Sequence, residues 1–121
     1  MPGDTVPVVK SERKKHILLR ALADPDNNIS EAASFTLGDL GLSPETVVPA
    51  LTNALQHHFQ MTRIGAARSL ALFGTNAIIA IPALRIALDD SDSYVREKAS
   101  NALEVIISAS QTGVSGVPSA S

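Results

Sequence analysis

The sequence repeats an apolar pattern every 33 residues, and this periodicity constrains the fold more than any single motif. A shift of 33 positions places Ala21-Leu22 on Ala54-Leu55 and then on Ala87-Leu88. A fixed period of this length is typical of stacked arrays, in which each unit buries its apolar face against its neighbours. The same shift aligns three further sets of apolar residues: Ala33, Ala66 and Ala99; Leu37, Leu70 and Leu103; and Leu40, Phe73 and Ile106.

Each unit has the spacing of a helix pair. Apolar residues recur three or four positions apart, as in Ala99, Ala102 and Ile106, which is the helical period. Polar links at residues 24–28 and 89–93 interrupt the pattern and carry the Asp, Asn and Ser residues that favour turns and helix starts. The sequence therefore predicts helices at about 10–23, 28–40, 44–56, 61–73, 76–88 and 93–108.

Glycine and proline predict where helices end or bend. Gly41 and Gly74 follow the last apolar residue of a unit, where a left-handed residue commonly ends a helix. Pro49 and Pro82 share one repeat position inside the first helix of their units. Proline there loses a hydrogen bond and collides with the carbonyl group four residues earlier, so we expect a kink or a later helix start.

We expect one helical domain at residues 10–108, with repeats at about 9–41, 42–74 and 75–107. Residues 1–9 are predicted to form a flexible N-terminal arm, because they have little apolar surface to bury. Residues 109–121 are predicted to form a flexible C-terminal tail, because they offer few large apolar groups to offset the entropy of ordering.

Composition argues against several classes of function. The chain has no cysteine, which excludes disulfides, thiol chemistry and cysteine-rich zinc sites. Its net charge of -2 gives no broad basic field, so nucleic acid is not expected as a partner. No stretch is expected to reach the roughly 18 to 20 apolar residues of a membrane span, and no signal-peptide segment is expected at the N-terminus. These features predict a cytoplasmic protein without a membrane span.

No residue pattern indicates catalysis, a cofactor or a metal. Nucleophilic catalysis needs a base oriented beside Ser or Thr, and phosphate binding often uses a glycine-rich loop; neither motif occurs. His57 and His58 are adjacent, but neighbouring side chains are expected to point apart, and His16 lies far away in the chain. We therefore expect a protein that is not an enzyme and that binds neither cofactor nor metal.

The third unit carries a recognisable motif, made of Pro82-Ala83-Leu84, Ala87-Leu88, Asp90-Ser91-Asp92, Val95-Arg96, Ala99 and Ala102-Leu103. This motif resembles the short HEAT repeat named after phycobilisome lyases, and the likeness extends over about residues 14–107. The signatures of ankyrin and tetratricopeptide repeats are absent. The resemblance implies an all-α fold, an α-solenoid of three antiparallel helix-pair repeats in a right-handed α-α superhelix.

The resemblance also implies a ladder of charge-assisted hydrogen bonds between link aspartates and the arginine that follows the valine. His57 replaces the aspartate in the second repeat and Ser30 replaces the arginine in the first. We therefore expect at most the rung from Asp24 to Arg63 to be complete, and the rung between the second and third repeats is left open. The candidate ladder residues are Asp24, Arg63, Asp90 and Arg96.

The second helices of such repeats are expected to line a concave groove that binds a protein partner. Phe35 and Ile64 are the leading candidates, because apolar side chains among mixed charges on a rigid surface commonly hold a protein or a helical peptide. In the alternative, both residues merely seal the stack. The candidate groove residues are Glu31, Phe35, Ile64, Arg68, Glu97, Lys98, Asn101 and Glu104.

The link of the second repeat, His57, His58, Phe59 and Met61, is a second candidate contact point, because the other links are polar. The alternative is that Phe59 or Met61 folds back onto the helix ends.

The C-terminal end is a third candidate contact, through Val105 and Ile107. Natural arrays usually end in a polar cap. An apolar end therefore predicts a homodimer contact, docking onto a larger assembly, or cover by the tail.

These patterns predict a non-catalytic protein–protein interaction module or assembly subunit, whose partner is another protein or a larger assembly. The family resemblance leaves one alternative, a bilin lyase-type subunit that handles a chromophore. Only three Phe and one Tyr are available to contact a tetrapyrrole, which disfavours that alternative. Nucleic-acid binding by a curved helical array is a third class, and the acidic balance and missing tryptophan argue against it.

Overall fold

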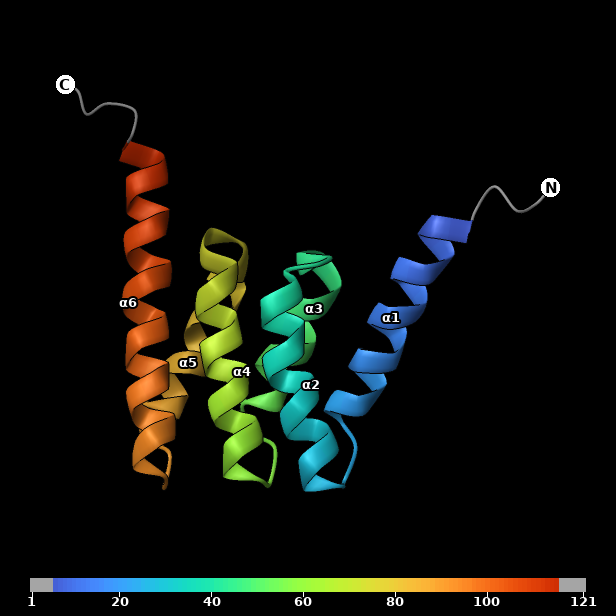
Figure 1. The fold of residues 1–121 in the computed structure, drawn as a ribbon. Coiled ribbons are helices and arrows are strands. Elements are labelled where there is room, and N and C mark those ends of the chain that lie inside the picture. Colours follow the sequence, from blue (N-terminus) through green and yellow to red (C-terminus); the bar gives the residue numbers. More distant parts are fainter. Residues whose placement is uncertain (1–5, 116–121) are drawn as a thin grey trace.

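The computed structural model describes the backbone of residues 6–115 and the side-chain environments of residues 12–111, and every regular element in that part is helical. Three helix pairs follow one another along the molecule (Figure 1). The elements are α1 (Val6–Leu22), α2 (Asn27–Leu40), α3 (Pro44–Ala54), α4 (Gln60–Phe73), the 3-10 helix η2 (Gly74–Ala80), α5 (Ile81–Ala87) and α6 (Ser93–Ser115). The predicted all-α fold is confirmed.

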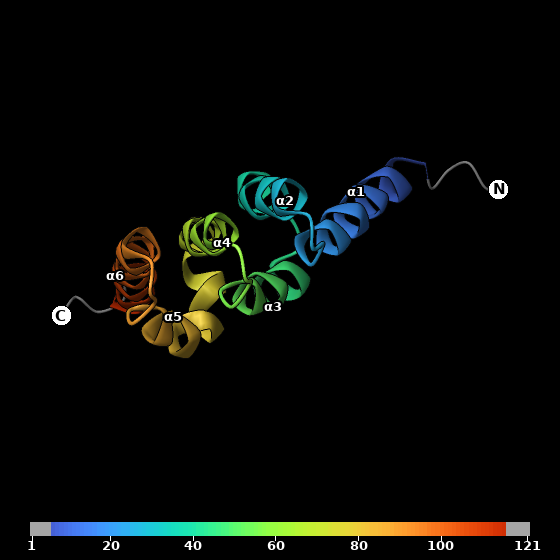
Figure 2. The same cartoon turned by 90° about the horizontal axis from the view of Figure 1, so that it is seen from below.

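The helices lie in two layers, which are visible when the molecule is seen from below (Figure 2). The second helices α2, α4 and α6 form one layer and pack on one another in chain order. The first helices α3 and α5 form the other layer, while α1 leans outward at the N-terminal end (Figure 1). Leu51, Leu70, Leu84 and Ile106 are fully buried in the core. The right-handedness of the superhelix stays a prediction.

Small residues bring α2 and α4 close together. Ser30 and Thr62 are fully buried, and their hydroxyl oxygens lie 2.8 Å apart across the two helices. Further along, the Ser69 hydroxyl donates a hydrogen bond to the backbone carbonyl of Ser34. A Cβ atom added to Gly38 would collide with Ser69, so this close approach requires glycine.

Aspartates start two of the three second helices. At the start of α2, Asp26 Oδ1 accepts hydrogen bonds from the backbone N–H groups of Asn28 and Ile29, at 2.9 and 3.2 Å. Asp92 Oδ1 accepts two backbone hydrogen bonds at the start of α6 in the same way. The link residues thus satisfy N–H groups that a helix start leaves free.

The predicted helix ends at the two glycines are confirmed, whereas the two prolines occupy different positions in their helices. Gly41 and Gly74 have positive φ angles of 61° and 55°. Helix α3 continues through Pro49, whereas α5 begins at Ile81, so that Pro82 lies in its first turn. Proline is tolerated there because its missing N–H would have no partner in the helix. The later helix start is therefore found in the third repeat, where η2 replaces the first part of the helix predicted at 76–88.

Both end segments are more helical than expected. Helix α1 already begins at Val6, inside the predicted arm 1–9, and α6 continues to Ser115, inside the predicted tail 109–121. The described helices therefore extend beyond the predicted domain bounds 10–108, and the flexibility of the arm and the tail stays a prediction. The rest of both predictions lies outside the described residues.

One described stretch, Gln60–Ala87, has 28 residues and contains an 18-residue window with a mean hydropathy of 1.7, which is enough for a membrane span by length and composition alone. The expectation that no stretch has such a composition is therefore wrong. This stretch comprises α4, η2 and α5, however, and the chain reverses direction between α4 and α5 (Figure 1). Helix α4 itself has 14 residues, fewer than the roughly 20 that a spanning helix needs.

Candidate functional site

One repeat position in the inter-helix links has the same local role in all three repeats. Asp24, His57 and Asp90 stand 33 positions apart. The side chain of each accepts a hydrogen bond from the backbone N–H two residues later, at 2.8, 3.1 and 2.9 Å. His57 does this through Nδ1, so the ring replaces the aspartate as the acceptor that shapes the turn.

Arg63 joins the second repeat to the third. Its Nε and one terminal nitrogen donate to the two carboxylate oxygens of Asp90, at 2.9 and 3.0 Å. The other terminal nitrogen donates to the backbone carbonyls of His57 and His58, at 2.8 and 3.2 Å. The two charged side chains are only 14% and 12% exposed, so this rung is a largely desolvated, bidentate ion pair.

The prediction of a rung from Asp24 to Arg63 is wrong. The complete rung is formed between the second and third repeats, by Arg63 and Asp90. Arg63 pairs with the aspartate 27 residues after it, so a rung runs from an arginine to the next repeat. Asp24 belongs to the first repeat and has no such arginine before it among the described residues. Arg96, at the other end, donates to the carbonyl of Asp90 in its own link at 2.7 Å.

The histidine pair joins the first two links. His57 Nε2 lies 3.3 Å from the backbone carbonyl of Asp24, and His58 Nε2 lies 2.9 Å from Asn27 Oδ1. The two rings stack with their centroids 4.3 Å apart, so the expectation that they point apart is wrong. Across the described residues, no cluster of three or more potential metal ligands occurs.

The other two candidate contact residues of this link are less exposed to a partner than expected. Phe59 and Met61 are both half-buried, and Met61 packs against the core. Of the four candidates in the link, His58 is exposed and His57 is half-buried. For Met61, the alternative that the side chain folds back onto the helices is therefore the one found.

The two leading groove residues mainly seal the stack. Ile64 is only 8% exposed and belongs to the hydrophobic core, so its assignment to an open groove is wrong. Phe35 is half-buried next to Gly65, where a Cβ atom would come too close to the phenyl ring. The Arg68 guanidinium lies 5.3 Å from the centre of that ring and also forms an ion pair with Asp39 at 3.0 Å.

Two exposed apolar residues of the second helices are Leu72 and Val105. They are 56% and 46% exposed and occupy the same repeat position on α4 and α6. Leu72 lies in the middle repeat and is nevertheless exposed. The exposure of Val105 is therefore a property of this repeat position, and it does not support the expectation that Val105 marks an uncovered C-terminal end. We define the second-helix face as two residues from each helix: Phe35 and Asp39, Arg68 and Leu72, and Asn101 and Val105.

The remaining predicted residues are scattered over this side. Ile107, the other expected end-face residue, is half-buried and packs against the core. Glu97, Asn101 and Glu104 are exposed, while Glu31 and Lys98 are half-buried. The sequence analysis did not include Leu72 among the candidate groove residues, because an apolar residue in a helical pattern is readily taken for a core residue. Its repeat position is shared with the charged Asp39, and this could have shown that Leu72 faces outward.

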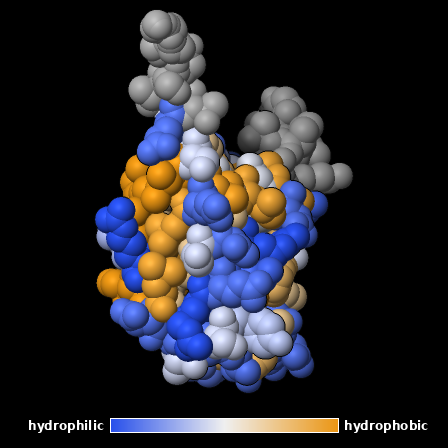
Figure 3. Space-filling view, turned by 90° about the vertical axis from the view of Figure 1, so that its left-hand side faces the viewer, coloured by the Kyte–Doolittle hydropathy of each residue, from blue (hydrophilic) through white to orange (hydrophobic). Residues whose placement is uncertain are grey.

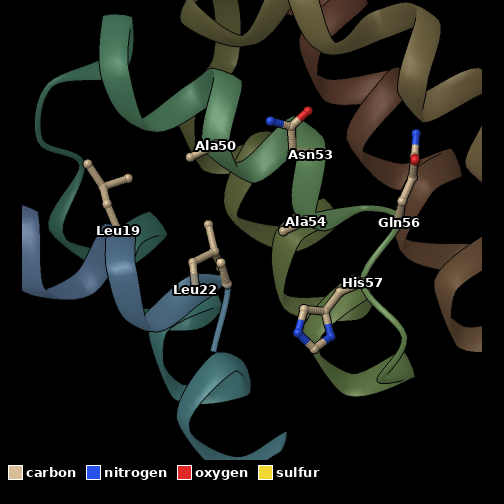
Figure 4. Close-up of a pocket in the computed structure, with 8 residues that line it drawn as sticks. Leu19, Leu22, Ala50, Asn53, Ala54, Gln56 and His57 are labelled. Atoms are coloured by element: carbon tan, nitrogen blue, oxygen red, sulfur yellow. The ribbon is translucent and has the colours of Figure 1, made fainter. Parts of the chain in front are cut away.

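The first helices leave hollows between them, unlike the tightly packed second helices. Figure 4 shows one, with Leu19 and Leu22 of α1 on one side and Ala50 and Ala54 of α3 on the other. Its volume is about 290 Å³, and His57 lies at its edge. This is just below the usual lower limit of about 300 Å³ for pockets that bind small molecules.

One carboxyl group on α1 has a shifted pKa. The pKa of Glu12 is lowered because Lys15 donates a hydrogen bond to it and adds a nearby positive charge. Lys15 also lies within 3.4 Å of the Ser43 hydroxyl, so this pair connects α1 to the start of α3. Glu12 is not part of the second-helix face.

Comparison with protein families finds a match over most of the chain. The family model described as HEAT repeats matches residues 15–104. The match is to HEAT repeats in general and does not single out the phycobilisome-lyase type. No curated protein matches the sequence.

Proposed function

Because the chain belongs to the HEAT-repeat family, we propose that it is a non-catalytic module that binds a protein partner on the second-helix face. HEAT repeats generally mediate protein–protein interaction, and the family typically provides scaffolds without catalytic activity. Stacked helical repeats present extended surfaces of this kind. The partner is then a protein segment that lies across α2, α4 and α6.

The exposure of Leu72 and Val105 is the observation that supports this proposal. Both are apolar, about half-exposed and equivalent by repeat position on helices that pack side by side. Helices in contact lie about 8 to 10 Å apart, so the two side chains match residues about two turns apart on a bound helix. Covering the exposed part of each contributes about 1 kcal/mol to binding.

The surroundings of these residues favour a specific partner. The ion pair of Arg68 and Asp39 lies beside the apolar residues, and its side chains are 39% and 59% exposed, so its exposed atoms can form hydrogen bonds with a partner. Phe35 under Arg68 fixes the guanidinium in place. A surface held in this way loses little side-chain entropy on binding.

The test is quantitative capture of partners from the native host, followed by mass spectrometry. The double variant Leu72→Asp, Val105→Asp should retain at most about a tenth of the partner that the unaltered protein retains. Ile86→Asp is the matched control, because Ile86 is 70% exposed but belongs to the other layer. Circular dichroism should show equal helical content in all three proteins.

Two outcomes would contradict the proposal. One is undiminished capture by the double variant. The other is loss of capture by Ile86→Asp alone, which would place the partner on the layer of first helices.

A further inference from the structure

The N-terminal end of the stack exposes residues whose equivalents are buried in the other repeats. Ile29 is 45% exposed, whereas Thr62 and Val95 at the same repeat position are fully buried. Leu40 is likewise 38% exposed, whereas its two equivalents, Phe73 and Ile106, are at most 8% exposed. In the second and third repeats these positions are buried, and Thr62 lies against Ser30 of the preceding repeat. In the first repeat, no described residue covers them.

The uncovered end is apolar. Ile17 of α1 is 60% exposed and lines an open hollow of about 560 Å³ between α1 and α2. The other lining residues are the apolar Leu18 and Leu40, Thr36, and the charged Arg13 and Lys14. Natural arrays usually end in a polar surface, and a contiguous apolar patch on a soluble protein commonly marks an interaction site. The uncovered apolar end expected at the C-terminus is thus found more clearly at the N-terminus.

The two ends carry one half each of a ladder rung. Arg96 donates to the carbonyl of its own link, as Arg63 does, but no carboxylate pairs with it among the described residues. Asp24 accepts from its own turn, as Asp90 does, but no described arginine pairs with it. An arginine without its aspartate therefore stands at one end, and an aspartate without its arginine at the other.

The C-terminal end also has the apolar and small residues that a following repeat would cover. Leu88 is 38% exposed, whereas its equivalent Leu55 is 4% exposed beneath the third repeat. Ser100 is exposed where its equivalent Ala67 is buried, and its small side chain allows a helix to approach. Viewed from this end, apolar side chains gather towards the side of α5, and polar side chains cover much of the rest (Figure 3).

We propose that two copies of the chain associate head to tail, with the N-terminal end of one stacked on the C-terminal end of the other. Ile17, Ile29 and Leu40 of one copy then cover Leu88 and Ser100 of the next. Arg96 of one copy pairs with Asp24 of the other, in the geometry of Arg63 and Asp90. Because this contact joins two different surfaces, it leaves one open end of each kind and can add further copies.

The experiment is sedimentation velocity on the full chain over a range of concentrations. The unaltered protein should form dimers and longer species as its concentration rises. Ile29→Asp removes the N-terminal surface and Leu88→Asp the C-terminal surface, and each should raise the dissociation constant at least about tenfold. A mixture of the two should form dimers that grow no further, because each variant keeps the surface that the other lacks.

Charge reversal tests the rung without altering the apolar residues. Asp24→Arg and Arg96→Asp should each weaken association about tenfold, and the double variant should recover it. Leu72→Asp is the control that leaves association unchanged, so failure of this inference is distinguishable from failure of the second-helix face. A monomer at all concentrations would overturn the inference. Association of Leu88→Asp alone, or an inert mixture, would do the same.

Discussion

Arg63 and Asp90 form a two-point ion pair that closes the contact between the second and third repeats, with nitrogen–oxygen distances of 2.9 and 3.0 Å. The same guanidinium also binds two backbone carbonyls of its own link. One side chain thus fixes the turn within a repeat and the contact between repeats.

Replacing Arg63 with Met should lower the free energy of unfolding by about 2 to 3 kcal/mol, because it leaves Asp90 half-buried without its partner. Urea denaturation of dilute protein measures the loss. Arg96→Met is the matched control at the same repeat position; Arg96 is exposed, so its loss should stay within about 0.5 kcal/mol. Equal losses at the two positions would argue against the rung.

Gly38→Ala should destabilise the protein by about 1 to 3 kcal/mol, although alanine is the better helix former. The added Cβ meets the side chain and the Cα atom of Ser69 on the facing helix, so the helices must move apart. Adding Ser69→Gly should recover part of the loss. Thermal unfolding of the two variants distinguishes this contact from an effect on α2 alone, which the second substitution would not repair.

The hydroxyl pair of Ser30 and Thr62 should behave as a coupled unit. Ser30→Ala leaves the buried Thr62 hydroxyl without a partner and should cost about 1 to 2 kcal/mol. Thr62→Val should cost less, because the Ser30 hydroxyl can still donate to the carbonyl of Asn27 at 3.3 Å. A double-mutant cycle from urea denaturation should give a coupling energy of about 1 kcal/mol; additive losses would mean that the hydroxyls do not interact.

Ile64→Asp should lower the free energy of unfolding by about 3 kcal/mol or more, because it buries an unpaired carboxylate in the core. Leu72→Asp, two turns later on the same helix, should change it by at most about 0.5 kcal/mol. Circular dichroism during thermal unfolding provides the comparison. A stable Ile64→Asp variant would return Ile64 to the set of exposed groove candidates.

Much of the architecture follows from residue spacing. The 33-residue period and the helical spacing of apolar residues predict three helix pairs, and the glycines that end α2 and α4 are placed correctly. Local sequence patterns do not predict the backbone conformation where contacts with neighbouring elements determine it. The short α5 is one case, since the residues before it form a 3-10 helix although they match the α-helical start of α3 by repeat position.

The candidate site was less predictable than the fold. Phe35 on α2 and Ile64 on α4 stand at positions that face outward when each helix is considered alone. In the structure, Phe35 packs beside Gly65 of the next helix, and Ile64 belongs to the hydrophobic core. Of the four predicted ladder residues, Arg63 and Asp90 form a rung, whereas the expected partner of Arg63 was Asp24. Spacing along the chain does not say whether a link faces the repeat before it or the one after it.

The amino-acid sequence alone determined the helical repeat, its period, its turns and most of the residues that form its core, since these depend on local hydrogen bonding and on the burial of a periodic apolar face. Only the tertiary structure decided which outward residues stay exposed, which arginine meets which aspartate, and which end of the stack is left apolar. These properties depend on the distances between helices, and those are set by side chains that meet across repeats, such as Ser30 with Thr62 and Arg63 with Asp90.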